Sequence, residues 1–108
     1  MRPERRKIRE HIPVEELLAG LAEEASELSQ AALKYRRALT GVNPTPVPME
    51  DAYDRLLAEI ADVQLYMSML DIDWLIVDDI KDEKSERWVQ RLEEWKSEEP
   101  GLSDHFGA

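Results

Sequence analysis

The chain has 108 residues, no cysteine and a formal net charge of -10. This length fits one ordinary domain, and the lack of cysteine excludes disulfides and thiolate metal ligands and favours a reducing cytoplasm. The negative charge disfavours nucleic-acid binding, which needs clustered Lys and Arg, and no apolar stretch is long enough to cross a membrane. We therefore expect one unexported cytoplasmic domain in which oxygen atoms hold any metal.

Residues 1–13 are predicted to form a basic N-terminal arm. Its cations are Arg2, Arg5, Arg6, Lys7 and Arg9. No apolar signal-peptide core follows them. A basic arm can contact nucleic acid or a targeting receptor, but scattered cations on a frayed terminus are more often solvated. We expect a solvated arm here, followed by the helical domain at residues 14–96.

The first long helix is predicted from Val14 to Leu39. Its apolar residues recur every three or four positions, which places them on one helical face. These residues are Leu17, Leu21, Leu28, Ala31, Tyr35 and Leu39. Gly41 suits the position after a helix end, and the prolines that follow cannot continue the helix. The first helix should therefore stop near Thr40-Gly41, and a stiff loop should follow.

The second helix is predicted from about Glu50 to Leu70. Between Leu56 and Leu70 it carries only two charged residues, Glu59 and Asp62. A helix that is apolar on nearly all sides is buried by neighbouring helices or by another subunit. We therefore expect this helix to be central.

Asp71-Ile72-Asp73 breaks the pattern, and a third helical region follows. Its apolar row consists of Val77, Ile80, Trp88, Leu92 and Trp95. The last residues, 97–108, are predicted to be a loose tail. We expect an all-α fold, an antiparallel bundle of three main helices that is completed by oligomerisation, because three helices in so short a chain bury too little apolar surface.

Acidic residues interrupt the apolar face of the first helix. Glu24 occupies the position between Leu21 and Leu28 where another apolar residue is expected. Glu27 and Glu23 lie within one turn of the helix from this patch. With 24 acids in 108 residues, a Glu-Glu-x-x-Glu run taken alone is easily a solvated helix face. Glu59 and Asp62 are harder to explain in this way, because the second helix has almost no polar face.

Carboxylates gathered in a region of low dielectric repel one another unless cations or protons neutralise them. Ligation by oxygen alone favours hard cations, Mg²⁺ or its substitute Mn²⁺, and four carboxylates suffice for two ions that share an anionic substrate. Magnesium coordination is commonly completed by substrate phosphates, so the pattern indicates phosphate chemistry with a metal-activated water. A carboxylate-bridged di-iron bundle needs Glu-x-x-His pairs, which His11 and His105 do not provide.

Three residues are candidates for substrate binding. Lys84 takes an apolar position in the row of the third helix, where it is placed to meet phosphates. Arg87, with Arg91 on the next turn, is suited to stabilise charge on a leaving pyrophosphate, although surface ion pairs explain both arginines as well. Tyr66 follows Asp62 by one turn, so it is placed either to carry a base or sugar or to pack in the core.

These residues resemble the MazG-like family of all-alpha nucleoside triphosphate pyrophosphohydrolases, whose signature is Glu-Glu-x-x-Glu on one helix and Glu-x-x-Asp on the next. The two motifs are residues 23–27 and 59–62 here, and the likeness extends from about Leu17 to Leu92. The resemblance implies hydrolysis of a nucleoside triphosphate to monophosphate and pyrophosphate, and a homodimer or homotetramer whose sites often lie between subunits. It also implies metal ligation by Glu24, Glu27, Glu59 and Asp62, with Glu23 in the outer shell or orienting the attacking water.

The resemblance has two departures, a long proline-rich segment between the motifs and a simplified basic pattern in the last helix. Two other functions remain open at this point. A non-enzymatic helical module would use the acids as a charged seam for a basic partner helix. A nucleotide sensor would bind its ligand without turnover.

Overall fold

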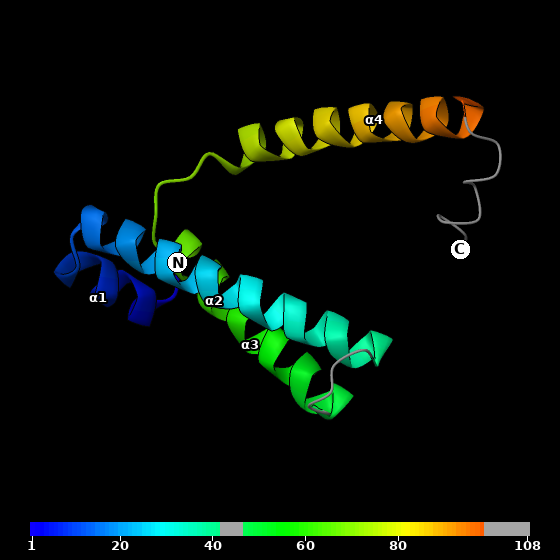
Figure 1. Ribbon diagram of the computed structural model, residues 1–108. Helices are drawn as coiled ribbons and strands as arrows, with labels where there is room; N and C mark the ends of the chain where they lie inside the picture. The colour runs from blue at the N-terminus through cyan, green and yellow to red at the C-terminus, as the bar shows by residue number, and fades with distance from the viewer. Residues whose placement is uncertain (42–46, 99–108) are drawn as a thin grey trace. The chain divides into compact units, whose positions relative to one another are not determined.

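The computed structural model describes residues 1–41 and 47–98, and these residues form four helices and no strand (Figure 1). Helix α1 spans Pro3–His11, α2 Val14–Thr40, α3 Met49–Ser68 and α4 Trp74–Glu98. The all-α class is therefore confirmed for the described part of the chain. Helix α4 extends two residues into the predicted tail, and the remainder of that tail, residues 99–108, lies outside the described residues.

The N-terminal residues form a helix that the sequence analysis did not predict. Pro3 suits the first turn of α1, and Glu4 in the first turn and Arg9 in the last turn complement the helix dipole. None of its side chains is buried, but the guanidinium of Arg9 pairs with the Asp71 carboxylate. The predicted basic arm is therefore helical from Pro3 to His11, with no buried side chain and one ion pair to the segment after α3.

Helix α2 ends where the sequence predicts. Gly41 adopts the left-handed conformation, with φ 67°, and its backbone N–H donates to the Arg37 carbonyl oxygen at 2.9 Å. This geometry favours glycine, which has no Cβ to clash in that region. The predicted stop at Thr40-Gly41 is confirmed, and the helix reaches Thr40.

Helices α2 and α3 pack side by side as an antiparallel pair (Figure 1). The direction follows from contacts along the pair: Gly20 meets Tyr66 near one end, and the Tyr35 and Tyr53 rings lie 5.7 Å apart near the other. The buried residues of the two helices are Leu17, Gly20, Ala31, Ala52, Glu59 and Val63. The core of this pair is thin, and it includes one glutamate.

Gly20 permits the close approach of α2 and α3 at one end of the pair. A Cβ added at Gly20 would lie 2.2 Å from Tyr66 Cε1, far inside van der Waals contact. The tyrosine ring therefore packs against the backbone of α2 and occupies the space that a larger residue would fill.

The second helix was predicted to be central, but only one face of α3 is buried. Val63 of α3 is buried, but Leu57 is 45% exposed and Leu65 is exposed as well. One neighbouring helix covers one side of α3 and leaves the rest of its apolar surface uncovered in this chain.

Helix α4 belongs to the second of two compact units, which begins at Asp73. Its start is capped by Asp73, whose Oδ1 accepts the Ile76 backbone N–H at 3.2 Å. Among its side chains from Trp74 to Ser97 none is buried, and Leu75 and Trp88 are 80% and 68% exposed. None of the described helices is both long and apolar enough to span a membrane.

Candidate metal centre between helices α2 and α3

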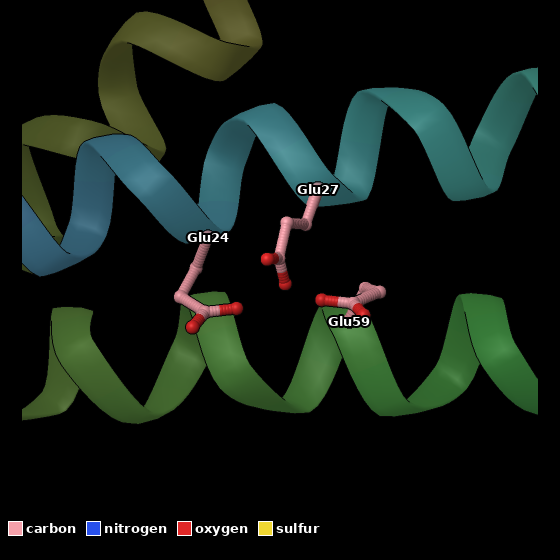
Figure 2. Close-up of side chains that lie close together, drawn as sticks. All are labelled: Glu24, Glu27 and Glu59. Atoms are coloured by element: carbon pink, nitrogen blue, oxygen red, sulfur yellow. The ribbon is translucent and has the colours of Figure 1, made fainter.

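Three carboxylates from the two packed helices face one another. Figure 2 shows Glu24 and Glu27 extending from α2 and Glu59 from α3 into the same space. One oxygen from each carboxylate lies within 4.8 Å of the other two. Two consecutive helices therefore place three potential oxygen ligands at one point, which is the arrangement a hard divalent cation needs.

The triad lies partly inside the helix pair. Glu59 is 5% exposed, Glu24 is half-buried and Glu27 is exposed. Glu24 Oε2 and Glu59 Oε2 are both buried and have no hydrogen-bond partner among the described residues. An unsatisfied buried carboxylate oxygen is costly, so both atoms fit a bound cation that would complete their coordination.

The surroundings of Glu24 favour its neutral form when no cation is present. Partial burial, followed by the negative charges of Glu27, Asp62 and Glu59, raises the pKa of Glu24 above its ordinary value of 4.5. A hydrogen bond with the Glu27 side chain acts in the same direction. A divalent cation would reverse this preference, because it stabilises the ionised carboxylates.

Arg55 is a participant that the sequence analysis missed. Its Nε donates to Glu59 Oε1 at 2.9 Å, one helical turn away on α3. The i, i+4 spacing was the available signal, but Arg55 lies just before the apolar stretch from Leu56 to Leu70 in which Glu59 and Asp62 stand out. A single guanidinium cannot balance three carboxylates, and it leaves Glu59 Oε2 unpaired.

The other two predicted acids, Asp62 and Glu23, lie outside the close triad. Asp62 is half-buried and near enough to affect Glu24 electrostatically, but it is not part of the close triad. Glu23 is exposed on α2 and also lies outside the triad. The structure thus brings together three of the four predicted metal ligands, Glu24, Glu27 and Glu59.

Tyr66 lies against Gly20, so the packing role that the sequence left open describes its position in this chain. Lys84 and Arg87 lie on α4, in the other compact unit, and both are exposed. With Trp88 and Arg91 they line a surface hollow of about 360 Å³ on one face of α4. The predicted cations of the last helix therefore do share one face.

Comparison with known proteins identified no relative, since no protein-family model, no curated protein and no solved structure matched the chain. The MazG-like resemblance therefore stays a prediction that depends on the two acidic motifs.

Proposed function

We propose that the protein is a Mg²⁺-dependent pyrophosphohydrolase that cleaves a nucleoside triphosphate, a deoxynucleotide or modified nucleotide, to a monophosphate and pyrophosphate. The observation that carries the proposal is the pair of buried, unpartnered oxygens, Glu24 Oε2 and Glu59 Oε2, within a triad of facing carboxylates. Carboxylates are the ligands that Mg²⁺ and Mn²⁺ prefer, and substrate phosphates commonly complete magnesium coordination.

Each acid has a role in this proposal. Glu24, Glu27 and Glu59 would hold the metal, and Asp62, one turn after Glu59 and half-buried, is the fourth proposed ligand. The bound ion would supply a Lewis acid for the phosphoryl oxygens and for the attacking water. Glu23, exposed beside the triad, is proposed to orient that water.

Hydrolysis adds one water across the phosphoanhydride between the α and β phosphates. The hydroxyl joins one phosphorus, the bridging P–O bond breaks, and the bridging oxygen leaves with the other fragment as the proton passes to solvent. Lys84 and Arg87, which share an exposed face of α4, are proposed to neutralise charge on the phosphates.

A homodimer or homotetramer is part of the proposal. The exposed apolar side chains of α4 include Leu75, Ile76, Trp88 and Val89, and the α2–α3 pair exposes Leu57 and Leu65. Exposed apolar surface of this extent is typical of subunit interfaces. We place the enzyme in a reducing cytoplasm, since it has no cysteine, and expect no nucleic-acid partner at a net charge of -10.

The burial of Glu59 disfavours the non-enzymatic module. A charged seam for a basic partner helix has to be accessible, whereas Glu59 is nearly fully buried between α2 and α3. The nucleotide sensor shares the same metal ligands and differs only in the absence of turnover.

A nucleotide panel scored for pyrophosphate against phosphate tests the proposal. We expect Mg²⁺-dependent pyrophosphate release that Glu24→Gln or Asp62→Asn lowers by about 100-fold or more, because each removes a charged ligand. Glu15→Gln, an exposed acid in the first turn of the same helix, is the matched control and should keep full activity. Retained turnover in Glu24→Gln would reject the site, and nucleotide binding without pyrophosphate release would identify a sensor.

A further inference from the structure

A second feature of the α2–α3 pair lies beside the carboxylate triad. A hollow of about 330 Å³ is lined by α2, by the first two turns of α3 and by the residue Val47 just before α3. Its described lining residues are Lys34, Val47, Asp51, Ala52 and Arg55. The hollow therefore combines two cationic side chains with one acid and two small or apolar residues.

The hollow adjoins the triad along both helices. Arg55 precedes Glu59 by one turn of α3, and its Nε donates to Glu59 Oε1 at 2.9 Å. Lys34 follows Glu27 by seven residues, which is about two turns or roughly 10 Å along α2. Positions four or seven residues apart lie on nearly the same face of a helix. The two cations and the triad therefore occupy one continuous side of the pair.

The charge of the hollow contrasts with that of the molecule. Lys34 and Arg55 against Asp51 leave it net positive, whereas the whole chain carries a formal charge of -10. Among the described residues Lys34 forms no ion pair, and Arg55 uses only Nε of its five N–H donors for Glu59. The Arg55 side chain is 57% exposed, so its remaining donors are accessible. Such a fork next to an ammonium group is suited to the oxygens of linked phosphates.

We infer that Lys34 and Arg55 bind the pyrophosphate portion of the substrate, the β and γ phosphates, in this hollow. The inference rests on the proposed function, since it assigns the phosphate subsite of the same centre. Arg55 thereby links two tasks, because Nε positions Glu59 in the triad while the other nitrogens contact phosphate. In this role both side chains contribute positive charge, and neither transfers a proton.

Binding of inorganic pyrophosphate to the full chain in the presence of Mg²⁺, measured by calorimetry, tests the inference. Lys34→Met should weaken pyrophosphate binding about tenfold, because it removes a charged donor and keeps the apolar stem. Arg36→Met is the matched control, an exposed cation two residues further along α2 and on a different face, and should bind normally. Inorganic phosphate should bind more weakly than pyrophosphate to the wild type. Lys34→Met should also lower the affinity for phosphate less than the affinity for pyrophosphate.

Arg55→Lys provides the second variant, because it keeps the positive charge near Glu59 while removing the planar fork. If Arg55 contacts phosphate, this variant should raise KM several-fold more than it lowers kcat, and its pyrophosphate affinity should fall. If Arg55 only balances the charge of Glu59, pyrophosphate affinity should not change. Circular dichroism melting of each variant checks that the helices remain folded.

The two proposals fail in different ways. Wild-type protein that turns nucleotides over normally, while Lys34→Met and Arg55→Lys bind pyrophosphate like the wild type, overturns the subsite and leaves the enzyme intact. Wild-type protein that binds no pyrophosphate overturns the subsite as well. Protein that binds pyrophosphate through Lys34 but releases none from any nucleotide supports the subsite and rejects the hydrolase.

Discussion

The α2–α3 pair and helix α4 use apolar residues in opposite ways. The pair buries Leu17, Ala31 and Val63 and inserts Glu59 among them, whereas α4 has no buried side chain between Trp74 and Ser97. Carboxylates are held in the pair, and the cations Lys84, Arg87 and Arg91 share a face of α4 with Trp88. The apolar faces of α2 and α3 thus cover each other, whereas the apolar and basic side chains of α4 are exposed.

This difference indicates a division of roles. A helix pair that holds three acids together needs a packed scaffold, because repulsion would otherwise separate the carboxylates. A helix whose large apolar residues are exposed is suited to contact another subunit.

Leu17→Ala should destabilise the protein by about 2–5 kcal/mol, because Leu17 is the most deeply buried large side chain of the pair. Leu75→Ala on α4 should lower the melting midpoint only through weakened association. Thermal melts at several protein concentrations separate the two effects. The drop in melting midpoint caused by Leu17→Ala should be independent of protein concentration. A concentration-independent drop of the same size in Leu75→Ala would contradict the division of roles.

Gly20→Ala should cost about 1–3 kcal/mol, because the new Cβ would overlap the Tyr66 ring and force it to move. Urea unfolding measures the change. The double variant Gly20→Ala/Tyr66→Leu should recover part of the loss if the clash is its source. Equal losses in the single and double variants would show that Tyr66 does not determine the spacing of α2 and α3.

Glu24→Gln should change how stability depends on pH in metal-free protein. The pKa of Glu24 is raised in the folded state, so its contribution is fully favourable below the ordinary value of 4.5 and is lost as pH rises through the folded pKa. Relative to the variant, the wild type should therefore lose stability as the pH rises above 4.5. Melts at several pH values with a chelator measure this loss, and added Mg²⁺ should reverse it in the wild type alone. Parallel pH profiles of the two proteins would contradict the raised pKa that burial and the neighbouring acids give Glu24.

Arg9→Ala should have the smallest effect, less than about 1 kcal/mol, because the Arg9–Asp71 pair is exposed to solvent and is screened. A double-mutant cycle with Asp71→Ala, measured by urea unfolding at low and high salt, isolates the interaction. A coupling that persists unchanged in high salt would show that α1 is held to the scaffold more firmly than an exposed pair allows.

Local rules predicted much of the helical structure. The end of α2 follows from Gly41, and the break before α4 follows from residues 71–73, because helix propagation and termination depend on neighbours a few positions away. Periodicity also identified Glu24 as an acid in an apolar position, and in the structure Glu24 is half-buried. Helix α1 was missed because it is short, basic and has no apolar periodicity.

The amino-acid sequence by itself determined where the three long helices lie and which acids interrupt their apolar faces, since both properties repeat along one helix. Only the tertiary structure decided that Glu59 meets Glu24 and Glu27, that Tyr66 packs on Gly20, and that Lys34 and Arg55 line one hollow. The reason is that periodicity specifies a face of a helix, whereas the register of two helices depends on how their side chains interlock.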